Sequence, residues 1–230
     1  AFTRVKKCFL LRESLTHTSF PIMSASDSQE KSAMFASYSL AEQFTNPRGA
    51  KTCQLSAGGK RVTLQPTSEP VPTPFSPSTF DKDPLATRLS LELRCNDERL
   101  LLFDSFDLWA KAYLLEHSER LFKKALTVKE IEESYHPCVK RHASGSYPPL
   151  LRTKIDTTGR RACTFWTPEG ERREAPVDWS MVTVVPQLEI CNLWSMSREM
   201  GWVIQCTALR VFEESLECPF AAEEAADESS

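Results

Sequence analysis

Glycine is scarce in this chain, and the motifs that enzymes build from it are missing. The 230 residues include only seven glycines. Gly59-Lys60 lacks the glycine five residues earlier and the following serine or threonine of a phosphate loop, and no Gly-x-Gly-x-x-Gly, Gly-x-Ser-x-Gly or His-Glu-x-x-His motif occurs. Acidic residues are scattered, so no pair of carboxylates stands out as a general acid and base. These absences predict a non-catalytic protein that needs no cofactor.

Long apolar runs are also absent. No stretch approaches the roughly 18 apolar residues needed to span a bilayer, which predicts a soluble chain without a membrane partner. The eight cysteines are widely spaced and lie mostly in apolar, strand-like segments. This usage favours reduced thiols in an intracellular protein over a disulfide framework.

A short segment near the middle of the chain holds three potential metal ligands, His136, Cys138 and His142. No second Cys/His pair stands at a zinc-like spacing, so we predict no metal site. The simpler interpretation is a loop with one buried cysteine and two surface histidines.

The first 48 residues show no firm periodicity and are predicted to form a flexible N-terminal arm. Within them, residues 1–22 carry four basic residues and one acidic residue, which weakly resembles an organelle-targeting peptide. Met23 offers a second interpretation, an initiation site preceded by a translated leader. We favour the second interpretation and keep the first as an alternative.

Residues 50–84 combine a hairpin signal with a proline run. Two β-prone segments, 50–56 and 61–65, flank Ala57-Gly58-Gly59-Lys60, where glycine supplies the positive φ of a tight turn. Residues 66–84 contain six prolines and cannot form a regular helix or a central strand. We expect an extended crossing or an ordered surface loop.

The rest of the chain predicts a mainly β fold with a helical insertion at residues 103–136. Leucines alternate with polar residues over 87–94, which predicts a half-buried strand. A helical period over 104–124, with Asp104 as N-cap, is followed by a capping box at Thr127 and a second helix to Tyr135. Five strands are expected after Pro137, at 150–155, 161–167, 174–179, 182–194 and 202–212, the last two as a long hairpin. The fold class is α+β, an OB-like antiparallel barrel or curled sheet spanning residues 49–212.

Charge is segregated along the sequence. Residues 213–230 hold seven acidic residues and no basic one, whereas residues 140–173 hold eight basic residues against three acidic. The formal net charge of -3 therefore becomes +4 when the seven tail charges are removed. A basic body with an acidic C-terminal tail suits a protein that holds a polyanion.

The basic segment predicts a cationic surface with a stacking ring. On a strand, Arg152 and Lys154 lie on one face, opposite Leu151, Thr153 and Ile155. If the three strands from 150 to 179 are neighbours, Trp166 joins these cations. Single-stranded nucleic acid needs cations for its phosphates and flat apolar faces for its bases. The candidate nucleic-acid-binding residues are Lys60, Arg61, Arg94, Arg152, Lys154, Arg160, Arg161, Trp166, Arg172 and Arg173; Trp194 and Trp202 are predicted to be core residues.

Six ordered blocks carry a family resemblance. They are Asn46-Pro-Arg-Gly-Ala-Lys51, Gly59-Lys-Arg-Val-Thr-Leu-Gln65, Pro72-Thr-Pro-Phe75, Tyr147-Pro-Pro-Leu-Leu-Arg-Thr-Lys154, Ile190-Cys-Asn-Leu-Trp194 and Gly201-Trp-Val-Ile-Gln205. With the helical Phe-Lys-Lys124 stretch between them, they resemble a family of single-stranded DNA-binding proteins of large eukaryotic DNA viruses. The resemblance implies an oligonucleotide-binding barrel that acts in replication or repair without catalysis, in the nucleus or at a viral replication site.

The acidic tail fits the same hypothesis, because an intramolecular polyanion competes with DNA for the groove. Displaced by DNA, it would recruit replication or repair proteins. RNA remains an alternative ligand, since no sugar-reading residue is identifiable. Two other functions stay open: a structural or assembly protein, such as a minor virion component or complex subunit, whose basic patch docks an acidic partner, and a nucleic-acid-processing enzyme with an unrecognised site.

Overall fold

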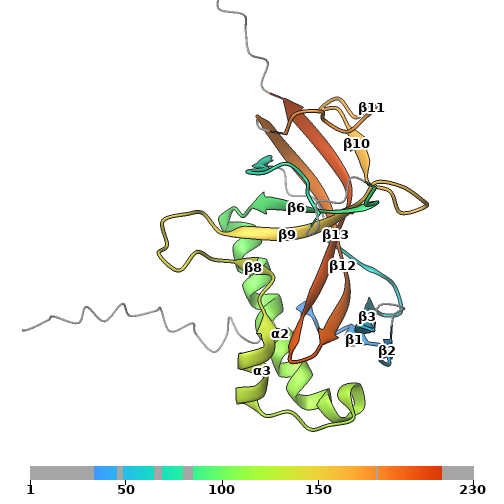
Figure 1. The fold of residues 1–230 in the computed structure, drawn as a ribbon, viewed down its shortest axis with the longest axis vertical. Helices are drawn as coiled ribbons and strands as arrows, with labels where there is room; N and C mark the ends of the chain where they lie inside the picture. Colours follow the sequence, from blue (N-terminus) through green and yellow to red (C-terminus); the bar gives the residue numbers. More distant parts are fainter. Residues whose placement is uncertain (1–33, 46–48, 65–68, 80–84, 180, 214–230) are drawn as a thin grey trace, which may run out of the picture.

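The computed structural model describes residues 34–45, 49–64, 69–79, 85–179 and 181–213 (Figure 1). Its strands are β1 (Tyr38–Leu40), β2 (Phe44–Thr45), β3 (Lys51–Ala57), β4 (Val62–Leu64), β5 (Val71–Pro72), β6 (Arg88–Arg94), β7 (Tyr135–His136), β8 (Val139–Lys140), β9 (Leu150–Asp156), β10 (Thr164–Trp166), β11 (Arg172–Arg173), β12 (Val182–Met196) and β13 (Glu199–Glu213). Its helices are α2 (Asp97–Phe122) and α3 (Val128–Ser134).

A long hairpin of β12 and β13 forms the centre of the fold (Figure 1). Two bulges interrupt it: Thr207 is the extra residue opposite Gln187/Leu188, and Cys191 is the extra residue opposite Val203/Ile204. Because an extra residue resets the alternation, the buried side chains step by three there, from Ile190 to Leu193 on β12 and from Cys206 to Leu209 on β13. One face of the hairpin therefore stays apolar along its whole length. The predicted hairpin is confirmed.

Three consecutive strands line the outer edge of β12. β3, β4 and β5 all pair antiparallel with it, at residues 192–195, 188–190 and 183–184 respectively. The predicted turn is present, since Ala57 and Lys60 exchange backbone hydrogen bonds and Gly58 and Gly59 have positive φ. The predicted partnership is wrong, because β3 and β4 pair with β12 rather than with each other. The described part of the proline run continues as an extended segment that bridges to β6 at Ser78.

The outer edge of β13 is lined by β7, β9 and β10, all parallel to it. β9 also pairs with β6 and β8, whereas β10 pairs with β11. The condition that the three strands from 150 to 179 are neighbours is therefore not met, because β9 and β10 lie end to end on β13. Residues 174–179 do not form the expected strand, and the strand in this region is β11, two residues earlier.

Both helices lie between β6 and β7, as the predicted insertion requires. α2 begins earlier than expected: Asn96, whose side chain accepts a hydrogen bond from the Arg99 amide at 3.0 Å, is the N-cap in place of Asp104. α3 begins with the predicted capping box, in which Thr127 and Glu130 satisfy each other's backbone amides.

The core lies between the apolar face of the hairpin and α2. Phe103, Phe106 and Leu114 of α2 are fully buried in it, together with Leu91 and Leu151 of the crossing strands. The fold is thus mainly β with two inserted helices, and the predicted class, an OB-like curled sheet, is confirmed.

The predicted arm needs a correction. Phe35 is buried in the core and contacts Phe106, and β1 pairs with β3, so residues 34–45 belong to the folded body. The limit at 48/49 is therefore too late. Residues 1–33 of the expected arm and 214–230 of the expected tail lie outside the described residues, and the limit at 212/213 stays a prediction.

Candidate nucleic-acid interface

The second face of the β12–β13 hairpin is polar. Residues paired across a ladder point to the same side of a sheet, so the register defines this face. It carries the pairs Trp194↔Gly201, Asn192↔Val203, Glu189↔Gln205, Gln187↔Ala208 and Val185↔Arg210. We call it the polar face.

Register places several predicted site residues on this face. Lys154 pairs with Gln205, and Arg152 lies two residues earlier on the same side of β9. Trp166 pairs with Arg210 on one side and with Arg172 on the other. The alternation predicted for β9 is confirmed, because Leu151, Thr153 and Ile155 are buried.

The cations of β9 are held by β6. Arg152 donates two hydrogen bonds to Glu92, with its Nη2 3.1 Å from Oε1, and Lys154 Nζ donates to Ser90 Oγ at 2.6 Å. Burial lowers the pKa of Lys154, and the nearby charges of Arg152 and Arg88 lower it further. Lys154, Arg152 and Arg88 repel one another, and a bound anion would reduce this repulsion.

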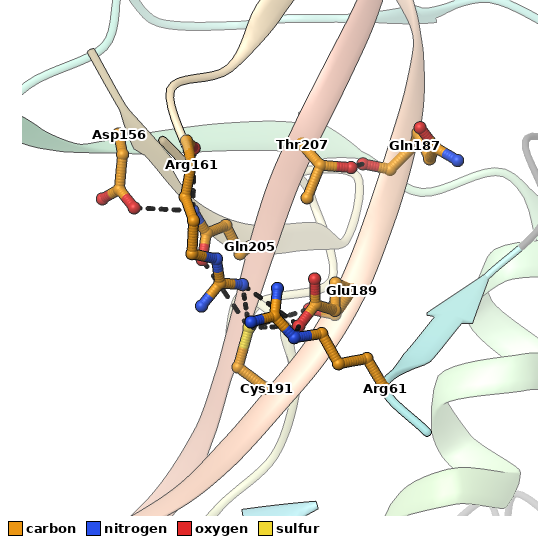
Figure 2. Close-up of polar contacts among 8 residues, drawn as sticks. All are labelled: Arg61, Asp156, Arg161, Gln187, Glu189, Cys191, Gln205 and Thr207. Carbon is orange, nitrogen blue, oxygen red and sulfur yellow. Dashed lines mark hydrogen bonds and ion pairs between the residues drawn. The ribbon is translucent and has the colours of Figure 1, made fainter. Parts of the chain in front are cut away.

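At the middle of the polar face, two arginines converge on one buried carboxylate (Figure 2). Glu189 is 6% exposed, and its Oε1 lies 3.1 Å from Arg161 Nη2 and 3.8 Å from Arg61 Nε. The loop that carries Arg161 is fixed by Gln205, which donates to Asp156 Oδ2 at 2.7 Å and to the Arg161 carbonyl at 3.4 Å. One negative charge thus orients two guanidinium groups, whose side chains remain 40% and 58% exposed. With two arginines and one glutamate, the cluster has a net positive charge.

A groove of about 900 Å³ lies beside this cluster, between β13 and the strands β7, β8 and β9. Its lining includes four basic residues, Lys140, Arg141, Arg152 and Lys154, and one acidic residue, Glu199. Val139, Val203 and Ile204 supply an apolar floor. A groove of this kind offers cations at its walls and apolar surface between them.

Trp194 forms an aromatic platform at one end of the groove. Its ring stacks with His136, with centroids 5.8 Å apart and planes 23° from parallel. The indole also contacts Gly201, where an added Cβ atom would lie 3.0 Å from the ring. A larger residue at this position would have to push the ring aside by a few tenths of an ångström, so the close approach of Gly201 helps to fix the orientation of the half-buried indole.

The prediction that Trp194 is a core residue is wrong, whereas Trp202 is buried and donates to the Tyr135 hydroxyl at 2.9 Å. The bulge at Cys191 explains the error, because it moves Trp194 to the polar face while Leu193 faces the core. Trp166 is half-buried, and its Nε1 donates to Thr164 Oγ1 at 2.9 Å.

The remaining predicted site residues are dispersed. Lys60, Arg94 and Arg160 are exposed at different edges, Arg172 is exposed beside Trp166 at the end of the polar face, and Arg173 is paired with Glu213 at 2.7 Å. Sequence reasoning missed four groove residues, His136, Lys140, Arg141 and Trp194. Three of them lie in the His136–His142 segment, whose histidines and basic residues are the signal that points to them. Within the described ranges, no group of three His, Cys, Asp or Glu residues is arranged to hold a metal ion.

Comparisons with known proteins give similarity in structure alone. No family model matches the sequence, and no curated protein matches it. The single-stranded DNA-binding protein from bacteriophage Enc34 is similar in structure. In its complex with single-stranded DNA it has a TM-score of 0.41 and 10% identity, over 80% of this chain and 96% of that chain. A second structure of that protein gives 0.39 and 12%, over 80% and 99%.

Similarity at this level transfers no residue or contact to the present chain. The resemblance to the viral family therefore stays a prediction. Among the described residues, no helix is both long and apolar enough to cross a membrane.

Proposed function

We propose that this chain binds single-stranded DNA along the polar face, with the groove beside β13 as the principal site. The groove supports this proposal by joining four cations and a rigid, half-buried indole on one surface. Phosphates are attracted to the cations, and an unpaired base can stack on the indole without regard to its sequence. The Arg61–Glu189–Arg161 cluster would extend the phosphate path beyond the groove.

We further propose a role in replication or repair without catalysis, in keeping with the viral family that the sequence resembles. The acidic tail would compete for the polar face and recruit protein partners when DNA displaces it. An assembly protein is the alternative, in which the same basic surface docks an acidic protein.

Titration with oligothymidine at several salt concentrations tests the proposal. We expect quenching of tryptophan fluorescence and a log-log salt slope of several units, because phosphate binding releases counterions. Lys140 is exposed and lines the groove, so we expect it to contact a phosphate. Lys140→Ala is therefore expected to reduce the salt slope by about 1. The matched control is Lys129→Ala on α3, a similarly exposed lysine away from the groove, which should leave the slope unchanged.

Three outcomes would contradict the proposal: no binding at low salt, binding without quenching, or equal effects of the two lysine variants. Oligouridine in the same assay decides between DNA and RNA. An acidic peptide that competes with oligothymidine at equal charge would favour the assembly function.

Removal of residues 214–230 is expected to tighten oligothymidine binding severalfold at low salt, because an intramolecular competitor is lost. Glu213 is retained in this deletion because it pairs with Arg173. The gain should vanish at high salt, where charge attraction is screened. Unchanged or weaker binding at low salt would refute the competitor role of the tail.

A further inference from the structure

The outward face of α2 carries a stripe of exposed leucines. Leu101, Leu108 and Leu115 are spaced by seven residues and are 60%, 64% and 38% exposed. Seven residues correspond to about two helical turns, so the three side chains form a line about 21 Å long. Ala112, also exposed, lies between the last two. Isolated surface leucines are common, but a heptad-spaced series indicates a partner surface.

The stripe is unrelated to the packing of α2 in its own fold. The core-facing side of the helix is occupied by Phe103, Phe106, Ala110 and Leu114, which are all fully buried. On a helical wheel the exposed leucines lie opposite these residues. The apolar face of the hairpin packs on the core side of α2, so the stripe points away from the polar face.

Acidic residues flank the stripe at both ends. Asp97 and Glu98 lie in the first turn, and Glu116 and Glu119 lie beside Leu115; all four are exposed. The nearby basic side chains are paired within the protein: Lys111 donates to Glu132 at 2.7 Å, and Arg120 donates to the Leu40 carbonyl at 3.1 Å. The stripe is therefore apolar in the middle and negative at its ends.

We propose that this face of α2 docks a basic amphipathic helix of another protein. Apolar residues at heptad spacing in the partner would cover Leu101, Leu108 and Leu115, and lysines or arginines would meet the acidic ends. A second copy of this chain fits poorly, because parallel and antiparallel pairing of α2 both place acidic ends against acidic ends. Nucleic acid is repelled by the same charges. The partner can bind while the polar face is occupied.

A fluorescently labelled 21-residue synthetic peptide tests the surface. It carries leucine at three heptad positions with lysines beside them, and its binding to the full chain is followed by anisotropy. We expect the triple variant Leu101→Ala, Leu108→Ala, Leu115→Ala to weaken binding at least tenfold with no change in melting temperature or circular dichroism. The control is Val177→Ala, at a fully exposed valine outside both helices, which should have no effect.

Two further peptides sharpen the result. One has glutamate in place of lysine and the other has the leucines out of register; both are expected to lose binding. Saturating oligothymidine should not displace the basic peptide. Equal binding by the triple variant would place the peptide on other acidic residues and overturn the proposal. Sedimentation showing a dimer that the triple variant abolishes would also overturn it, in favour of a second copy.

Discussion

Replacement of Trp194 by alanine is expected to weaken oligothymidine binding by about 10- to 100-fold, because a stacked base contributes roughly 1–3 kcal/mol. The indole is half-buried and contacts His136 and Gly201, so its orientation is fixed before DNA binds and little ordering cost arises on binding. The variant should also lose part of the fluorescence quenching. The measurement is the titration described above, at one fixed salt concentration.

Trp194→Phe is the matched control, since a phenyl ring keeps the stacking surface, and it should stay within a few-fold of the parent. Trp166→Ala tests the far end of the polar face and separates one stacking site from two. A Trp194→Ala protein that remains folded and binds with parental affinity would exclude the groove as the principal site.

Replacement of Asp107 by alanine is expected to lower the free energy of unfolding by about 3 kcal/mol, because it leaves buried donors without an acceptor. Asp107, on α2, accepts from the Tyr135 hydroxyl at 2.6 Å and from the Cys138 amide at 3.0 Å. Tyr135 in turn accepts from Trp202 Nε1. This chain of hydrogen bonds joins α2 to β7 and β13 directly beneath the groove.

Asp104→Ala is the control, three residues earlier on the same helix. Its carboxylate pairs with Arg141 at the surface, so the loss should be about 0–1 kcal/mol. Chemical denaturation of both variants checks the difference. Equal losses would mean that the buried network does not support the groove.

The same carboxyl group predicts a pH dependence. Burial raises the pKa of Asp107, although its hydrogen bonds to Tyr135 and Cys138 oppose the rise. The folded state then holds the proton more tightly than the unfolded chain, whose aspartate pKa is about 3.9. The stability from this group is therefore complete below pH of about 4 and is lost as pH rises through the folded-state pKa. Asp107→Asn, which cannot ionise, should flatten that part of the stability profile.

Patterns that are local in the sequence gave correct predictions. The alternation in β6 and β9 needs only neighbouring residues, and so do the capping box at Thr127 and the glycine turn at Gly58-Gly59. The start of α2 was misplaced because Asn96 and Asp104 are both good caps. The unbroken run Leu100-Leu101-Leu102 hides the helical period between them.

Features that depend on distant pairing could not be predicted. The convergence of Arg61 and Arg161 on Glu189 requires β4, the β9–β10 loop and β12 to meet, and no local pattern specifies that meeting. Trp194 lies in a strongly apolar strand, which predicts a core residue, and the local sequence does not show that the bulge at Cys191 turns it to the polar face. The groove itself lies between β13 and the strands β7, β8 and β9, and no local pattern specifies the order of these strands.

The end-to-end arrangement of β3, β4 and β5 along β12 also has a kinetic consequence. Residues 51–72 find their partners at residues 183–195, so these contacts close very long loops. During synthesis from the N-terminus, β3, β4 and β5 therefore keep an unpaired edge until β12 has been made. The β12–β13 hairpin, which closes locally, is made after all the other described strands and is the element on which they assemble. Folding of this protein is expected to be slow and to be completed only after the C-terminal hairpin is available.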